Sequence, residues 1–412
     1  MGDCLESLTP LKPKRMLALV WGDNVMNKWA LFLLWLAGIN LRITVLAVPP
    51  VIPFIHDDLA LSEKAVGALG GLPVLVFGIG ALFGSLLLAR TGVIKALIAG
   101  LAITGVAGAL RGVGPDVTIL FAMTGLMGLG IAIMQPAMPT LVAHWFEDHA
   151  GVATATYVNG LLVGEIIGAA FTTALAGYLG GWGAALAVWS LFLVLNIVLL
   201  VWALQTGRVT RPGLKGKGVP EKWWPDWRDG KMLLCGAILG CASSLYFTSN
   251  AFLPDFLHAT GRGGLTDAAL TALNGGQLPA SFLLLVYADR MVGRNWPLVA
   301  IGAIAMLVSL ALAFSEGEWA AIFLSGMVGF CASFVLILVL ALPPILADPR
   351  QVHRFSAGVF MIGYTLSFIT PVISGALWDM THVPASAFLP IAAAGLCLVV
   401  LAATLRISPR KS

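Results

Sequence analysis

Charge is the first thing that this sequence lacks. Only 11% of its 412 residues are Asp, Glu, Lys or Arg, whereas 59% are hydrophobic. A soluble domain usually spends about a quarter of its residues on these four charged types. So little charge cannot coat a surface that faces water. The composition therefore excludes a soluble globular protein and predicts an integral membrane protein.

Other absences exclude further classes of protein. The five cysteines (Cys4, Cys235, Cys241, Cys331 and Cys397) are odd in number and scattered, so we expect neither a disulfide framework nor a metal site. The chain has no Walker sequence, no HExxH motif and no filter-like motif, which argues against an ATP-driven pump, an enzyme and a channel. We expect no cofactor. The net charge of +4 falls mainly in loops beside apolar runs, and we expect no nucleic-acid partner.

Long apolar runs are what the sequence has instead. A helix needs roughly 20 mainly apolar residues to cross a bilayer, because its backbone polar groups must be satisfied internally. The sequence therefore predicts an all-α membrane protein with twelve transmembrane helices. The runs cover 29–54, 65–89, 93–112, 117–142, 152–178, 184–205, 232–257, 268–288, 296–315, 319–343, 355–378 and 387–406.

The longest internal polar stretch divides these runs into two sets of six. Leu72-Pro73 in the second run is matched by Leu278-Pro279 in the eighth, so the halves repeat each other weakly. Such parallel repeats build many secondary transporters, with the solute site between them. We expect an N-terminal segment (1–28), a six-helix bundle (29–205), a central loop (206–231), a second six-helix bundle (232–406) and a tail (407–412).

The basic residues predict the orientation of the chain. Lys and Arg collect in cytoplasmic loops. If the N-terminus is cytoplasmic, all 24 basic residues except Arg42, Lys64, Arg111 and Arg262 fall on the inside. We therefore expect a multi-pass protein of a cell membrane with both termini and the central loop in the cytoplasm. The lack of any Asn-x-Ser/Thr sequon agrees with a bacterial inner membrane.

Two charges interrupt the apolar runs near their middles, Arg42 in the first and Glu165 in the fifth. A charge at mid-bilayer costs a few kcal/mol or more, so such residues are functional candidates. Arg42 cannot lose its proton and must face a cavity, a carboxylate or an anion, whereas Glu165 can be neutralised. We hypothesise that the two pair in the empty protein and that a proton or an anion breaks the pair. The alternative is a permanent bridge between two helices.

Neutral polar residues recur at helical spacing. Tyr246 and Asn250 share one face of the seventh run, and Asn274 and Gln277 share one face of the eighth. This pattern suits a wet cavity, although polar side chains also join neighbouring helices. Gln135 precedes Pro136 and Pro139 in the fourth run. Prolines lack an N–H, so we expect either a backbone carbonyl that is free to line the transport path or a kink without a ligand. The candidate substrate-binding residues are Arg42, Gln135, Tyr157, Tyr246, Asn250, Asn274, Gln277 and Tyr364.

Two polar features lie at the ends of runs. Arg111 closes the third run, where snorkelling to the interface explains it and a gating role is the alternative. His149 follows Glu147 and Asp148 in a short loop, for which we expect a solvated turn.

The six-plus-six arrangement with a basic central loop resembles the major facilitator superfamily. Residues 40–42 (Asn-Leu-Arg), 71–78 (Gly-Leu-Pro-Val-Leu-Val-Phe-Gly) and 109–111 (Ala-Leu-Arg) are similar to its cyanate/2-nitroimidazole porter family. The resemblance implies two bundles that expose a central site alternately to each side of the membrane. It also implies that the neighbouring first and fifth helices bring Arg42 and Glu165 to that site.

The same resemblance suggests gating residues in two loops. The superfamily's loop between spans two and three normally carries an Asp before its Arg, but here Arg90 stands without one. The corresponding loop after span eight keeps Asp289 together with Arg290 and Arg294. We expect these four residues, with Arg111, to act in gating.

Together these features predict a secondary active transporter for a small anion or small polar molecule, coupled to protons as a symporter or antiporter. By resemblance, its cargo is cyanate-like or nitroimidazole-like. The expected partners are this solute, protons and membrane lipid, and we expect a monomer. The alternatives are a broad-specificity drug or metabolite exporter and a non-transporting membrane receptor or assembly factor.

Overall fold

The computed structural model describes residues 27–61, 63–114, 116–212 and 222–405. These residues contain helices and no strand, and twelve segments among them are long and apolar enough to cross a membrane. The predicted fold class and the count of twelve spans are confirmed. The predicted segments 1–28 and 407–412 lie almost entirely outside the described residues, as does the middle of the central loop.

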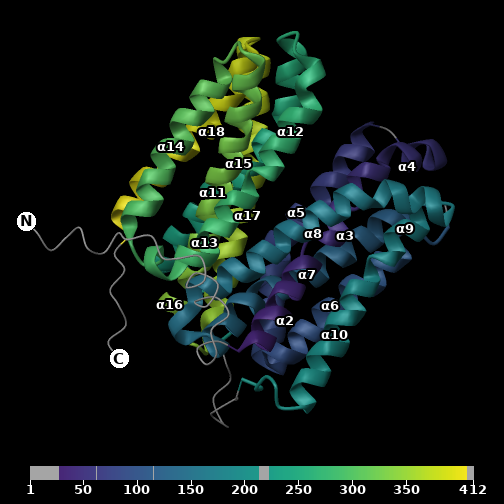
Figure 1. The fold of residues 1–412 in the computed structure, drawn as a ribbon, viewed down its shortest axis with the longest axis vertical. Coiled ribbons are helices and arrows are strands. Elements are labelled where there is room, and N and C mark those ends of the chain that lie inside the picture. Colours follow the sequence, from purple (N-terminus) through teal and green to yellow (C-terminus); the bar gives the residue numbers. More distant parts are fainter. Residues whose placement is uncertain (1–26, 62, 115, 213–221, 406–412) are drawn as a thin grey trace, which may run out of the picture.

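The helices form two bundles that lie side by side (Figure 1). The first comprises α2 (Lys28–Asn40), α3 (Ile43–Leu46), α4 (Ile52–Leu59), α5 (Glu63–Thr91), α6 (Val93–Leu110), α7 (Val117–Trp145), α8 (Ala150–Leu179), α9 (Trp182–Val188) and α10 (Ser190–Gln205). The second comprises α11 (Gly230–Ala259), α12 (Thr266–Gly275), α13 (Gln277–Met291), α14 (Asn295–Ala313), α15 (Glu318–Leu340), α16 (Leu342–Leu346), α17 (Val352–Thr381) and α18 (Leu389–Thr404).

The first span is broken where its charge stands. After α2, the amides of Leu41 and Arg42 bond to carbonyls three residues back, which tightens the turn and ends the helix. The short helix α3 follows, and Pro49 and Pro50 then lack the N–H groups that a continuing helix needs. Arg42 therefore lies at a joint between two helical segments.

Glycines on α8 let this broken span approach closely. Gly160, Gly164 and Gly168 recur every four residues and thus share one face of the helix. A side-chain carbon on any of them would overlap the backbone of the first span. The carbonyl oxygens that it would meet belong to Trp35, Ile39 and Ile43, respectively. Small residues of this kind allow membrane helices to pack backbone against backbone, so Glu165, next to Gly164, comes within reach of Arg42.

The bundles meet mainly along α5 with α17 and α8 with α13. We call the end that carries residues 206–212 and 222–229 the loop end, and the opposite end the far end. In the described parts of the chain, the hydrogen bonds that join the bundles lie between mid-helix and the loop end. Figure 1 shows the bundles diverging toward the far end, where α4 and α12 lie.

Candidate functional site

The centre of the molecule holds an ion pair. The Nε atom of Arg42 lies 3.3 Å from Oε1 of Glu165, and each side chain is 10% exposed. The break after α2 and the glycine face of α8 together create this contact. The structure thus brings together the two charges that the sequence singled out.

Polar residues of the second bundle surround the pair. Gln277, at the start of α13, lies within hydrogen-bonding reach of both Glu165 and Tyr246. Tyr364, on α17, lies within hydrogen-bonding reach of Arg42. The charges come from one bundle and their neutral partners from the other, so a movement between the bundles changes the surroundings of the pair.

Aromatic rings cover one side of the Arg42 guanidinium. Its central carbon lies 5.3 Å from the centroid of the Phe77 ring, a distance at which a cation is attracted to the ring face. Tyr364 lies 5.6 Å from Phe77 and 6.0 Å from Phe360 between ring centroids. Arg42 therefore has an aromatic partner in addition to Glu165.

A small pocket with a cavity volume of about 30 Å³ opens beside the ion pair. Its lining combines a polar and an apolar set from both bundles. The polar residues are Arg42, Glu165, Ser243, Tyr246, Gln277 and Tyr364, and the apolar residues are Leu161, Ala242, Phe247, Ala332 and Leu336. This mixture of lining residues suits a small solute held by a few polar groups.

Asn250 and Asn274 do not line this pocket but stand behind it. The Tyr246 hydroxyl donates to Oδ1 of Asn274 at 2.8 Å, and Nδ2 of Asn274 donates to Oδ1 of Asn250 at 3.2 Å. These bonds hold the Tyr246 hydroxyl in place. The two asparagines thus position a pocket residue rather than line the pocket.

Tyr157 and Gln135 also lie outside the pocket lining. Both are buried, and among the described residues neither the Tyr157 hydroxyl nor Oε1 of Gln135 has a hydrogen-bond partner. The helix α7 continues through both prolines after Gln135, and the Pro136 carbonyl accepts a bond from the Thr140 hydroxyl at 2.7 Å. Four of the eight predicted binding residues therefore reach the pocket.

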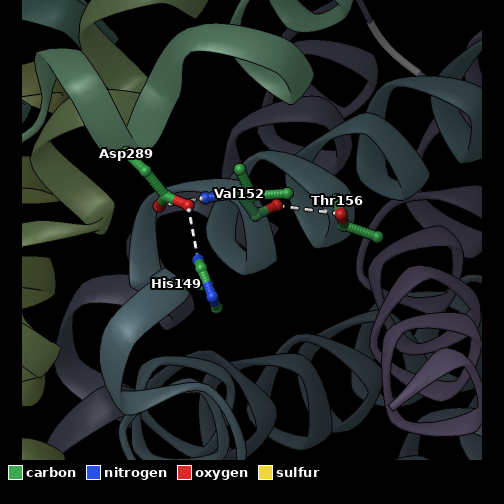
Figure 2. A network of polar contacts seen from close by, with 4 residues as sticks. All are labelled: His149, Val152, Thr156 and Asp289. Atoms are coloured by element: carbon green, nitrogen blue, oxygen red, sulfur yellow. Dashed lines mark hydrogen bonds and ion pairs between the residues drawn. The ribbon is translucent and has the colours of Figure 1, made fainter. Parts of the chain in front are cut away.

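At the loop end, Asp289 joins α13 to the start of α8 (Figure 2). Its Oδ1 accepts the backbone amide of Val152 at 3.0 Å, and its Oδ2 lies 3.1 Å from Nδ1 of His149. A carboxylate at a helix N-terminus satisfies free amides and meets the positive end of the helix dipole. The sequence interpretation of His149 as part of a merely solvated turn missed this contact between the bundles.

A different arrangement joins α5 to α17. The Ser85 hydroxyl lies 2.6 Å from the Trp223 carbonyl and 2.9 Å from Nδ1 of His353. Because a carbonyl can only accept, the single Ser85 proton goes to Trp223, and Nδ1–H of His353 donates to Ser85. Sequence reasoning did not single out Ser85 or His353, although a histidine at the start of an apolar run was a signal.

The remaining gating candidates differ in their surroundings. Arg90, Arg290 and Arg294 are exposed near the loop end, and the described chain shows no ion pair for them. Arg111 is 0% exposed, so the expectation that it snorkels to the interface is wrong. Its Nη2 donates to the Thr44 carbonyl at 2.7 Å inside the first bundle. Backbone atoms of α3, rather than lipid headgroups, are its partner.

Comparisons with known proteins agree with this architecture. The chain is 26% identical to the uncharacterized transporter YycB of Bacillus subtilis, over 87% of this chain and 89% of that one. It is also 26% identical to the cyanate transport protein CynX of Escherichia coli, over 92% of this chain and 97% of that one. The 2-nitroimidazole transporter of Escherichia coli is 25% identical over 82% and 86% of the two chains.

Solved structures share the fold at low identity. The Escherichia coli fucose:proton symporter FucP superposes with a TM-score of 0.70 at 14% identity, over 92% of this chain and 99% of that one. The human organic anion transporter MFSD10 gives a TM-score of 0.72 at 12% identity, over 91% and 99%. The family described as Major Facilitator Superfamily matches residues 30–275, more than half of the sequence. The chain belongs to the Major Facilitator Superfamily, whose members are membrane transporters rather than enzymes.

Proposed function

We propose that this protein is a secondary active transporter that moves a small anion together with a proton by alternating access. One observation carries the proposal, the buried contact of Arg42 with Glu165 at the edge of a pocket lined by both bundles. A cation that cannot be discharged is paired there with an acid that can. This combination supports coupled binding of an anion and a proton.

Charge balance explains the coupling. In the empty pocket, the guanidinium and the carboxylate cancel each other. When an anion binds Arg42 and a proton binds Glu165, the charges again sum to zero. Moving a net charge through a low-dielectric protein interior is costly, so both balanced states can pass between the two orientations. A pocket with only one of the two ligands carries a net charge, so the protein does not change orientation in that state.

The cargo that this pocket favours is small and electron-rich. The relatives CynX and the 2-nitroimidazole transporter carry names that indicate cyanate and a small planar heterocycle. A guanidinium backed by the Phe77 ring suits both, because it offers hydrogen bonds in one plane next to an aromatic face. The two opposite charges in the pocket lining favour this cargo over that of a broad-specificity exporter.

The orientation follows from the basic residues. If the loop end is cytoplasmic, as its Lys and Arg content indicates, the bonds of Asp289 and Ser85 hold the cytoplasmic side together. The pocket would then be reached from the far end. We place the protein in a bacterial inner membrane as a monomer.

Uptake by purified protein in proteoliposomes tests the proposal. Cyanate, thiocyanate, nitrite, formate and 2-nitroimidazole are offered outside, with and without an acidic exterior and with the membrane potential clamped by valinomycin and potassium. We expect an acidic exterior to drive uptake of at least one anion whatever the potential. Uptake that ignores the pH gradient would overturn proton coupling. Transport of large apolar compounds alone would favour the exporter.

A further inference from the structure

Arg111 is a second buried arginine that the proposed mechanism does not use. It follows the last residue of α6 and is 0% exposed. In the described residues, no carboxylate forms an ion pair with it. Its Nη2 donates to the Thr44 carbonyl, while Nε and Nη1 have no described partner. A guanidinium stays charged, and burying it without a counter-ion is costly, so its one bond needs an explanation.

The Thr44 carbonyl is left free by the shape of the first span. In a regular helix it would accept the amide of Val48, but that amide bonds to the Val45 carbonyl at 3.3 Å instead. Pro49 and Pro50 follow and offer no amide of their own. A carbonyl inside the bundle needs a donor, and Arg111 supplies it at 2.7 Å.

Two further bonds tie the same region together. Nδ2 of Asn40, on the other side of the break, donates to the Phe192 carbonyl of α10 at 3.3 Å. The Ser190 hydroxyl of α10 donates to the Gly105 carbonyl of α6 at 2.8 Å. The chain on both sides of Arg42 is therefore bonded to α10 or to Arg111 at the end of α6, through the Asn40 side chain on one side and the Thr44 carbonyl on the other. Neither α6 nor α10 contributes a residue to the pocket lining.

We propose that Arg111 is a positioning residue for Arg42. By bonding the Thr44 carbonyl, it fixes α3 against α6 and so sets the direction in which the break presents Arg42 to Glu165 and the solute. The bond lies two residues along the chain from Arg42, so losing it frees the joint itself. The transport readout of this inference rests on the proposed anion transport, whereas its structural readout does not.

The structural test measures access to α3. Val45 is replaced by cysteine in a background without native cysteines, and the rate of labelling by a membrane-impermeant maleimide is measured. We expect R111M to raise this rate about tenfold, because a bond to a charged group is lost, and R111K to restore most of the original rate. A rate in folded R111M equal to that of the parent would overturn the proposal.

The transport test compares KM with maximal rate for the anion found above. We expect R111M to raise KM about tenfold at unchanged amounts of folded protein, and R111K to recover part of the loss. R262M is the matched control, because Arg262 also donates to a carbonyl, that of Ser315 at 2.8 Å, but in the other bundle. A raised KM in R111M without faster labelling would overturn positioning and assign Arg111 a direct role.

The two tests fail separately. If R111M does not fold, R111K decides, because a lysine cannot form the same planar bonds. Faster labelling of α3 in R111K with a KM equal to that of the parent would overturn the proposal, since a loosened joint would then leave solute binding unchanged. If no anion is transported at all, the proposed function fails, but the labelling rates still report whether Arg111 holds α3.

Discussion

The first bundle contains two buried arginines that are held in opposite ways. Arg42 contacts a carboxylate and an aromatic ring at the edge of a pocket. Arg111 contacts a backbone carbonyl and does not line the pocket beside the ion pair. A proton can neutralise a carboxylate at accessible pH but not a carbonyl. The comparison teaches that a buried cation can act as a switch only when its partner titrates.

The largest expected effect comes from removing the switchable cation. We expect R42M to lower the initial rate of anion uptake in proteoliposomes at least 100-fold, because a charged hydrogen-bonded contact with the substrate is worth several kcal/mol. R262M, in the other bundle, should stay within about twofold of the parent rate. Substantial uptake by folded R42M would show that Arg42 only braces the fold.

Removing the titrating partner should change the pH profile more than the maximal rate. Uptake by the parent protein is expected to rise as the pH on the substrate side falls, because Glu165 must take up a proton. E165Q mimics the protonated acid, so we expect about a tenfold slower net uptake that no longer depends on pH, with anion exchange retained. An unchanged pH profile in E165Q would exclude Glu165 as the coupling site.

A double-mutant cycle sharpens the comparison further. Because Arg42 and Glu165 are in contact, the unfolding free energies of R42M, E165Q and the double variant in detergent should reveal a coupling energy of about 1–3 kcal/mol. The cycle of R111M with E165Q should give a smaller coupling energy, because Arg111 reaches the pair only through the Thr44 carbonyl. Equal coupling energies in the two cycles would show that Arg42 and Arg111 are related to Glu165 in the same way.

The smallest expected effect tests the packing beneath the ion pair. In G164A, the new methyl group would meet the Ile39 carbonyl and push α8 away from α2, at a cost of about 1–3 kcal/mol. We expect uptake to fall a few-fold and the unfolding temperature to drop. G177A is the control on the same helix, because nothing lies within 4 Å of its added carbon. If G164A and G177A behave alike, the close packing of α8 against α2 does not determine the contact between Arg42 and Glu165.

The fold and the central charges could be predicted from sequence because lipid allows few solutions. Apolar runs of sufficient length give the spans, and a charge within a span needs a partner. That reasoning identified both Arg42 and Glu165. Their separation of 3.3 Å, however, depends on the break after Asn40 and on the glycines of α8, whose combined geometry no single pattern encodes.

Two of the contacts that sequence reasoning missed share a physical cause. Arg111 bonds a carbonyl that is free only because the first span is irregular. Ser85 bonds another backbone carbonyl, that of Trp223 in the central loop. Backbone atoms are the same at every position, so the sequence carries no mark of which one a side chain will reach.

The bond from Val152 to Asp289 across the bundles has a practical consequence of the same kind. Its donor on α8 is a main-chain amide, so no replacement at position 152 other than proline abolishes it. Alanine substitutions along α8 would therefore leave this hydrogen bond intact, whereas alanine in place of Asp289 on α13 would remove it. The faces of α8 and α13 that meet here therefore differ in how well they tolerate substitution, although one hydrogen bond joins them.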